Sequence, residues 1–235
     1  MDDGVGDGGG VLRERAELVS KLTHEIRGPV STIRGLAGTT LEHYERLNDD
    51  ERREFLELIR REAGHLERTV EQVALALKLD AGTVRFDIRA QDLGVIVRDA
   101  AKATDTGDHP LEVDAGVSVE APVDAVQITF VVHQLIENAA TYSPSDSPIS
   151  VRLRRDGHDA LIEIVDRGPG IPPDRRESVF ERFADWRPAG YEDRAGTGLG
   201  LSICRTIART HGGDASIGEG PAGGTMLTVR LPLEG

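Results

Sequence analysis

Apolar residues recur every three or four positions through the first third of the chain, which predicts two long amphipathic helices. The first runs from Val11 to about Leu47. Pro29 is expected to kink it, because proline brings no backbone N–H donor to the helix. The second helix starts after Asn48, which forms a capping-box pattern with the glutamate three residues later, and it ends near residues 80–82.

Two antiparallel helices joined by a short turn cannot enclose a core, so the hairpin keeps apolar surface. Such surfaces are commonly buried by a second copy of the hairpin in a four-helix bundle. The pattern therefore predicts a homodimer. The alternative is that the hairpin packs on the second domain of its own chain.

From Thr83 the pattern changes to mixed helices and strands, which predicts an α+β two-layer sandwich. The expected helices span 92–104, 124–142 and 199–210. The expected strands are 84–86, 111–113, 117–119, 149–154, 160–165, 215–217 and 226–231, with the last four forming two hairpins. We therefore divide the chain into a Gly- and Asp-rich flexible tail (1–10), a helical domain (11–82) and an α+β domain (83–235).

Composition restricts the class of protein. A net charge of -13 argues against a nucleic-acid partner, because binding a phosphate backbone needs a clustered positive surface. The single cysteine, Cys204, excludes an internal disulfide, and its apolar helical context predicts a buried, inert thiol rather than a nucleophile. No apolar run reaches the roughly 20 residues that a membrane span needs. We expect a cytoplasmic protein, or the cytoplasmic portion of a membrane-bound one whose missing sensor region supplies the membrane attachment.

Four segments rich in glycine or amide side chains follow one another in the second domain. They are QLIENAATY (134–142), DRGPGI (166–171), GTGLGL (196–201) and GGT (223–225). The third segment has the clearest physical reason to bind a ligand, because glycines before a helix N-terminus let backbone N–H groups approach an anion. No Gly-Lys pair occurs in the chain, which excludes a Walker A loop, and the flanking strands lack the βαβ order of a Rossmann fold.

Together with the helical hairpin, these segments resemble the catalytic core of a bacterial sensor histidine kinase. The stretch HEIRGP (24–29) is similar to the H box of that family, and the four later segments are similar to its N, G1, G2 and G3 boxes. FERF (180–183) resembles its F box. The ATP-binding half alone would also resemble other GHKL ATPases, such as DNA gyrase or anti-sigma serine kinases, from which the H box separates this chain. The resemblance implies a dimeric four-helix bundle followed by a two-layer ATPase sandwich of the GHKL (Bergerat) type.

The resemblance also implies an ATP-dependent protein-histidine kinase. His24 would accept the phosphoryl group of ATP, and Glu25 would accept the proton of the other ring nitrogen. Asn138 would hold Mg²⁺ through its side-chain oxygen, and Glu137 would support the water shell of the metal. Arg182 would contact the phosphates.

Further residues are implied around the nucleotide. Asp166 would accept a hydrogen bond from the adenine amino group, and Tyr142 would stack on the base. The others are Gly168, Gly170, Arg187, Arg194, Gly196, Thr197, Gly198, Leu199, Gly200 and Thr225. The family's N-box lysine is Thr141 here, so the positive contact to phosphate falls to arginine, although the two later arginines could equally be solvated loop charges.

The phosphoryl group would pass to an aspartate in the receiver domain of a response regulator. Two alternatives remain open. His24 taken alone could be a surface histidine, and the chain could be a degenerate scaffold that binds nucleotide without transfer, for which Thr141 is the main support. Gly28, where many relatives carry Thr or Asn, predicts weak phosphatase activity because it offers no side chain to orient a water.

Overall fold

The computed structural model describes residues 8–192 and 196–234. Within that range, the side chains of residues 8–19, Lys21 and His24 lie outside the description. The chain divides into two compact units, one made of Met1–Leu75 with Ala195–Thr197 and the other of Ala76–Arg194 with Gly198–Gly235.

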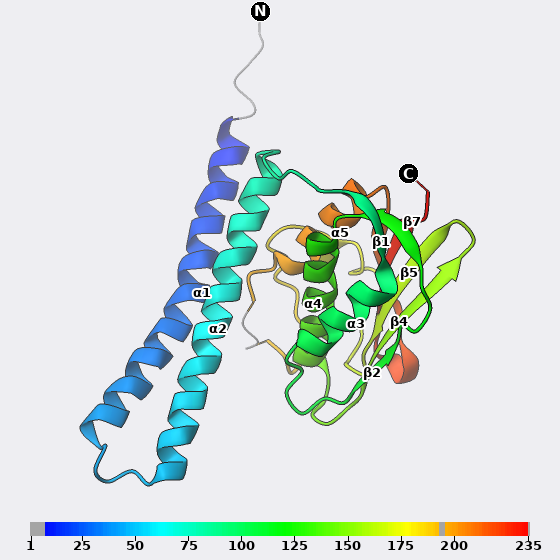
Figure 1. The fold of residues 1–235 in the computed structure, drawn as a ribbon. Coiled ribbons are helices and arrows are strands. Elements are labelled where there is room, and N and C mark those ends of the chain that lie inside the picture. Colours follow the sequence, from blue (N-terminus) through cyan, green and yellow to red (C-terminus); the bar gives the residue numbers. More distant parts are fainter. Residues whose placement is uncertain (1–7, 193–195, 235) are drawn as a thin grey trace, which may run out of the picture. The chain divides into compact units, whose positions relative to one another are not determined.

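The first unit contains the predicted long helix α1 (Gly8–Glu42) and most of the second, α2 (Asp49–Asp80), whose residues from Ala76 onward belong to the second unit. They run antiparallel as a hairpin (Figure 1). α1 begins three residues before its predicted start and ends five residues before Leu47, because residues 43–47 already form the turn. The helix is continuous across Pro29.

The turn of the hairpin is held by polar contacts that the sequence pattern predicted in part. The Asn48 amide donates to Glu51 Oε2 and the Glu51 amide donates to Asn48 Oδ1, both at 2.9 Å, which confirms the capping box. Arg52 adds a contact that was not predicted. Its guanidinium donates to the Tyr44 carbonyl from Nη2 at 2.6 Å and lies 4.3 Å from the centroid of the Tyr44 ring.

The apolar face of the hairpin is incompletely covered. Ile26 and Val30 on α1 are 37% and 44% exposed, and Leu56 and Val70 on α2 are 59% and 52% exposed. Pro29 and Thr69 are among its few buried residues. Exposed branched side chains on adjacent helical turns are the surface that we expected two helices to leave.

The second unit contains a mixed five-stranded sheet. Its strand order is β2 (Leu111–Asp114), β4 (Ile149–Asp156), β5 (Asp159–Val165), β7 (Thr225–Pro232) and β6 (Asp214–Glu219). All neighbours are antiparallel except β2 and β4, which are parallel. The hairpins β4–β5 and β6–β7 confirm the two hairpins that were predicted from the sequence. A separate two-stranded ribbon pairs β1 (Arg89–Asp92) with β3 (Glu120–Val123).

Three helices, α3 (Leu93–Ala103), α4 (Ala125–Tyr142) and α5 (Gly200–Thr210), cover one face of this sheet (Figure 1). Two short 3-10 helices, η1 (Ser178–Phe180) and η2 (Pro221–Gly223), lie in the connections. The core is built from branched aliphatic side chains of both layers, among them Leu93, Val97, Ile128, Leu135, Ile162, Ile164, Ile203, Ile207 and Leu231. The result is the predicted two-layer sandwich.

Two predicted strands are wrong. Residues 84–86 and 117–119 are irregular, and the strands that form nearby are β1 and β3. The apolar residues that suggested strands serve the core instead. Phe86 packs edge-on against the His211 ring at 5.5 Å, and Val119 is buried while its carbonyl accepts the Leu93 amide at 2.9 Å.

Asp124 joins three segments of the second unit. Its carboxylate caps α4 by accepting the Val126 and Gln127 amides at 3.0 and 3.1 Å, and it accepts the Asp87 amide at 2.9 Å. Its own amide donates to Nε2 of His211, at the end of α5, at 2.9 Å. Nδ1 of His211 is 2.8 Å from the Ile207 carbonyl, so the ring carries its proton there and Nε2 is free to accept. One residue therefore connects the start of α4, the end of α5 and the linker that enters the unit.

Cys204 is fully buried in α5, and this burial raises the pKa of its thiol. A thiol that resists ionisation is a poor nucleophile, which confirms the predicted inert side chain. None of the helices in the described ranges is long and apolar enough to span a membrane.

Removing the Asp124 carboxylate tests the junction. Because three amides would lose their acceptor in a site that is 7% exposed, we expect Asp124→Ala to lower the free energy of unfolding by about 2–3 kcal/mol. Asp92→Ala is the control, since that carboxylate caps α3 with a bond to the Gly94 amide and receives the Ser118 hydroxyl at a more exposed position. Urea unfolding of both variants should give the larger loss for Asp124→Ala, and equal losses would contradict this account.

Candidate functional site

The buried carboxylate of Asp166 is the centre of the site. It follows β5, is 4% exposed, and its Oδ1 accepts the Gly168 amide at 2.8 Å and the Thr225 amide at 3.0 Å. The Asp166 amide donates in return to the Thr225 carbonyl at 2.9 Å. Burial raises the pKa of the Asp166 carboxyl, and the amides of Thr225 and Gly168 act in the opposite direction.

Glycines around Asp166 allow backbone to pack on backbone. A Cβ on Gly168 would lie 2.5 Å from the Tyr142 carbonyl oxygen, and one on Gly170 would lie 2.3 Å from that of Gly223. A Cβ on Gly224 would lie 2.1 Å from the carbonyl oxygen of Asp166. No other residue fits these positions without movement of the backbone. The G1 and G3 segments and the end of α4 are therefore brought together.

The G2 segment approaches the N box and the F box in the same way. A Cβ on Gly200 would lie 3.0 Å from the side-chain carbon of Gln134, and one on Gly198 would lie 2.5 Å from the Ala184 carbonyl oxygen. Gly198 also has a φ of 69°, in the left-handed region that glycine adopts easily. Thr197 and Leu199 are buried, and Gly196 is half-buried. The glycines precede the N-terminus of α5, where helical N–H groups without an intrahelical partner can receive an anion.

The N-box residues lie on the last turns of α4. Glu137 and Asn138 are half-buried. The Thr141 hydroxyl donates to the Glu137 carbonyl at 2.8 Å. Oxygen donors of this kind suit Mg²⁺, which keeps several waters and is commonly held by one or two protein oxygens together with phosphates. The described residues contain no cluster of three or more His, Cys, Asp or Glu that could hold a metal by itself.

An aromatic pair lies at the end of the N box. The rings of Tyr142 and Tyr191 are 5.8 Å apart with an interplanar angle of 50°, and both are half-buried. Sequence reasoning singled out Tyr142 and missed Tyr191. The only feature of the sequence that marks Tyr191 is that no other aromatic residue lies between Trp186 and the G2 glycines.

The predicted arginines differ in their surroundings. Arg182 forms an ion pair with Asp80 within the second unit. Arg187 donates to the carbonyls of Trp186 and Ala184 at 2.9 and 3.2 Å, so its guanidinium helps to fold the loop that carries it. Arg194 lies outside the described residues.

The H-box residues lie on α1 in the first unit. Glu25 is half-buried, and of His24 the structure describes only the helical backbone. Gly28 has open space around it, so a Cβ there would meet nothing within 4 Å. The H box is therefore presented on a continuous helix, with room beside Gly28 for a larger side chain.

Two family models match the chain. Residues 14–82 match the His Kinase A (phospho-acceptor) domain, and residues 123–235 match the histidine kinase-, DNA gyrase B-, and HSP90-like ATPase domain. Together they cover more than half of the chain.

Similar proteins include sensor kinases from several bacteria. The sensor protein KdpD of Clostridium acetobutylicum is 28% identical over 94% of this chain and 25% of its own length. The sensor-like histidine kinase SenX3 of Mycobacterium tuberculosis (strain H37Rv) is 30% identical over 93% of this chain and 54% of its own length. The chain thus spans between a quarter and about half of these curated relatives.

Solved structures share the fold. The histidine kinase AdeS of Acinetobacter baumannii has a TM-score of 0.64 at 20% identity, covering 89% of this chain and 98% of that one. The mycobacterial sensor histidine kinase MprB has a TM-score of 0.51 at 27% identity, covering 62% of this chain and 97% of that one.

The pKa of Asp166 gives a test of its environment. Because its folded pKa is raised above the ordinary 3.8, the native state binds more protons than the unfolded state between the two values, and its stability rises as the pH falls through the raised pKa. Above the raised pKa the ionised carboxylate therefore bears the full burial cost. Asp166→Asn removes the charge and keeps an oxygen for both amides. We expect it to melt at the same or a higher temperature than the unmodified protein at pH 7, with a difference that shrinks as the pH falls toward about 4. A lower melting temperature at pH 7, or a difference that grows on acidification, would contradict this assignment.

Proposed function

Because the chain belongs to the sensor histidine kinase family and contains its phospho-acceptor and ATPase domains, we propose that it autophosphorylates on His24 with ATP and passes the phosphoryl group to a response-regulator aspartate. The observation that carries this proposal is the combination, in one chain, of the His24–Glu25 pair on α1 with the buried Asp166 carboxylate and its glycine segments.

The chemistry requires a nucleophile and a base on adjacent residues. A neutral ring nitrogen of His24 attacks the γ-phosphorus, the bond from that phosphorus to the bridging oxygen breaks, and ADP leaves. Glu25 accepts the proton from the other ring nitrogen, which keeps electron density on the attacking nitrogen. The phosphoryl group then leaves the His24 nitrogen for a carboxylate oxygen of the receiver aspartate, and the ring regains a proton to return to neutral imidazole.

The ATPase domain holds and orients the nucleotide. The carboxylate of Asp166 accepts the hydrogen bond of the adenine amino group, since its Oδ1 already receives the Gly168 and Thr225 amides and Oδ2 receives neither of them. Tyr142 lies against the base, and Tyr191 extends that aromatic surface. The segment from Gly196 to Gly200 presents backbone N–H groups and the start of α5 to the phosphates.

Magnesium would supply charge neutralisation at the phosphates when bound. Asn138 would offer its amide oxygen to the metal, and Glu137, one position earlier on α4, would accept hydrogen bonds from metal-bound water. The remaining positive charge at the phosphates comes from arginine, because the chain has no lysine after Lys102.

The partners follow from the same assignment. The exposed side chains of Ile26, Val30, Leu56 and Val70 favour a homodimer in which two hairpins form a four-helix bundle. The receiver domain of a response regulator would dock beside His24. No nucleic-acid partner is proposed, in view of the net charge of -13. We place the chain in the cytoplasm, alone or as the cytoplasmic portion of a membrane-bound sensor.

One observation favours a second candidate, a scaffold that binds nucleotide without transferring phosphate. Thr141 replaces the lysine of the family's N box, and its hydroxyl is already bonded to the Glu137 carbonyl, so it brings no cation to the phosphates. Autophosphorylation distinguishes the two candidates directly.

We expect His24→Ala to abolish labelling by γ-labelled ATP while ATP binding stays unchanged, because nucleophile and nucleotide are carried by different domains. The unmodified protein should carry an acid-labile, base-stable label, as a phosphohistidine does. His43→Ala, in the hairpin turn, is the matched control and should label normally. Label that persists on His24→Ala would show a different acceptor, and an unlabelled wild-type protein would support the scaffold.

We expect Asn138→Ala to remove the increase in ATP affinity that Mg²⁺ produces, because the side-chain oxygen of residue 138 is proposed as the protein ligand of the metal. Affinity for ATP in EDTA should be retained. Gln127→Ala is the control, since it deletes an amide near the other end of the same helix. Calorimetric titrations with and without Mg²⁺ make the comparison, and a magnesium effect that survives Asn138→Ala would reject this placement.

A further inference from the structure

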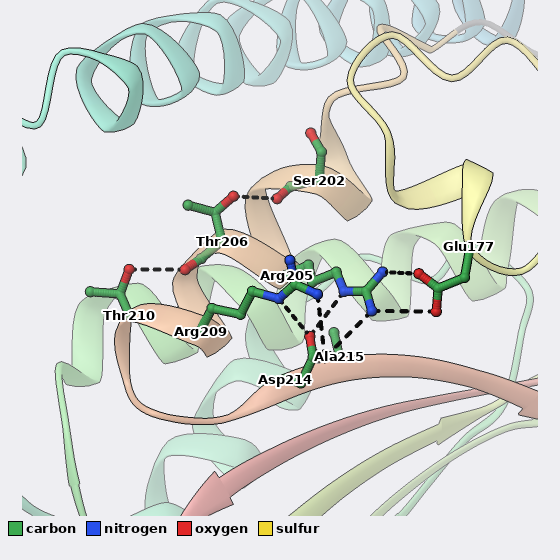
Figure 2. A network of polar contacts seen from close by, with 8 residues as sticks. All are labelled: Glu177, Ser202, Arg205, Thr206, Arg209, Thr210, Asp214 and Ala215. Atoms are coloured by element: carbon green, nitrogen blue, oxygen red, sulfur yellow. Dashed lines mark hydrogen bonds and ion pairs between the residues drawn. The ribbon is translucent and has the colours of Figure 1, made fainter.

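Arg205 lies between two segments of the second unit and contacts both (Figure 2). It is in the middle of α5, and its side chain is only 14% exposed. Nη1 donates to Glu177 Oε2 at 2.5 Å, and Nε donates to Asp214 Oδ1 at 2.9 Å. Glu177 immediately precedes η1, and Asp214 begins β6.

The guanidinium also covers an aromatic ring. Its central carbon lies 4.6 Å from the centroid of Phe180, which is the first residue of the F box and is 7% exposed. A planar cation over a buried ring is attracted by the π-electrons and shields the ring from water. One side chain of α5 thus holds the turn at residues 177–180 by an ion pair and by a stacking contact.

The charges are matched around this arginine. Hydrogen bonds from Arg205 are the chief cause of the lowered pKa of the Asp214 and Glu177 carboxyls. The same two carboxylates raise the pKa of Arg205. Arg209, one turn later, shares Asp214 through a bond from Nε at 3.1 Å, and its charge acts on Glu177 only through space. Only Arg205 links α5 to the F-box turn among these described pairs.

The end of the F box is held against the same helix by a different contact. Gly198, just before α5, packs so closely that a Cβ there would lie 2.7 Å from the Phe183 carbonyl carbon. Phe183 has a φ of 59°, a left-handed conformation that is strained for a bulky residue. Strain of this kind persists only where the surrounding contacts determine the backbone. Here the turn is fixed on one side by Arg205 and on the other by the close approach of Gly198.

We propose that Arg205 is a positioning residue for nucleotide phosphate, which clamps the F-box turn onto α5 and so fixes the backbone amides of the G2 glycines. It contacts no substrate itself and acts through Glu177 and Phe180. This inference rests on the proposed function, because it assumes that the segment from Gly198 to Gly200, in the same unit as Arg205, receives the phosphates. It predicts that a variant without the Arg205 contacts binds ATP more weakly and binds adenosine as tightly as the unmodified protein.

Two variants open the clamp and two matched controls do not. Arg205→Lys keeps the charge but replaces a planar fork by a point charge that cannot stack on Phe180 while it reaches both carboxylates. Glu177→Gln removes the F-box ion pair at a side chain that is 82% exposed, where we expect a substitution to have little effect on folding. The controls are Arg209→Lys, on the same helix, and Asp174→Asn, an exposed carboxylate shortly before Glu177 that is paired with Arg175 instead.

The measurement is the affinity of each full-length variant for ATP and for adenosine at low ionic strength, where the exposed ion pair is least screened. We expect ATP binding to weaken about fivefold or more in Arg205→Lys and by a smaller factor in Glu177→Gln, with adenosine within about twofold throughout and both controls unchanged. The double variant should lose no more than Arg205→Lys alone, because the two residues act through one contact.

The clamp would be overturned by any of three results: the affinities for ATP and adenosine fall equally, neither affinity falls, or the controls lose as much ATP affinity as the variants. If Arg205→Lys fails to fold, the exposed Glu177→Gln variant decides by the same criteria. Failure of the proposed function would look different. An unmodified protein that binds ATP no better than adenosine would show that the phosphate site is wrong, and an unlabelled protein that still binds ATP would reject phosphoryl transfer and leave the clamp standing.

Discussion

The burial of one carboxylate, Asp166, is the constraint on which the second unit depends. Two amides from different loops converge on its Oδ1, so the exit of β5 and the entry of β7 must meet backbone to backbone. Side chains would prevent that approach at Gly168, Gly170 and Gly224, where an added Cβ would lie within 2.5 Å of a carbonyl oxygen. The cost of burying the charge appears in the raised pKa of the carboxyl. Carboxyl groups with a perturbed pKa are common at binding sites, which supports the role in adenine recognition that we propose for Asp166.

The helix layer carries the other half of the candidate site because α4 and α5 contact each other near both ends. The His211 ring at the end of α5 accepts the Asp124 amide at the start of α4. At the opposite end, Gly200 at the start of α5 packs on Gln134. The two helices therefore run antiparallel, and the proposed metal ligands on the last turns of α4 share an end of the layer with the G2 glycines. Arg205 then extends this arrangement to the F box.

The sequence predicted the elements whose signals are local. Helical periodicity and the Asn48 cap located the helices to within a few residues, and alternation located the two hairpins of the sheet. It could not predict pairing between distant segments. β1 and β3, with sequences RAQD and EAPV, contain residues that disfavour strands and form because they pair with each other. The parallel pairing of β2 with β4 likewise joins segments far apart in the chain, so a local sequence pattern cannot predict it.

The candidate site shows the same division. The residues of the H, N, G1, G2 and G3 boxes were found because short motifs carry them, and the structure brings the N, G1 and G3 segments together with Gly198 and Gly200 of the G2 segment in the second unit. Tyr191, the backbone conformation of Phe183 within the F box, and Arg205 were not singled out from the sequence. Their roles come from a ring contact, a left-handed backbone and an ion pair across 28 positions, and none of these has a local pattern. Arg187, by contrast, fitted a motif-based role but uses its guanidinium on nearby carbonyls.

The central claim is that the carboxylate of Asp166 both organises the loops and reads the adenine amino group. The most direct test is the affinity of Asp166→Asn for ATP and for ITP, whose ring carries an oxygen acceptor where ATP has the amino donor. The oxygen of the amide can still receive the Gly168 and Thr225 amides, while its NH₂ group now faces the base as a donor. We predict that the unmodified protein prefers ATP and that the folded variant loses this preference or binds ITP more tightly. An undiminished preference for ATP in the folded Asp166→Asn protein would contradict the account.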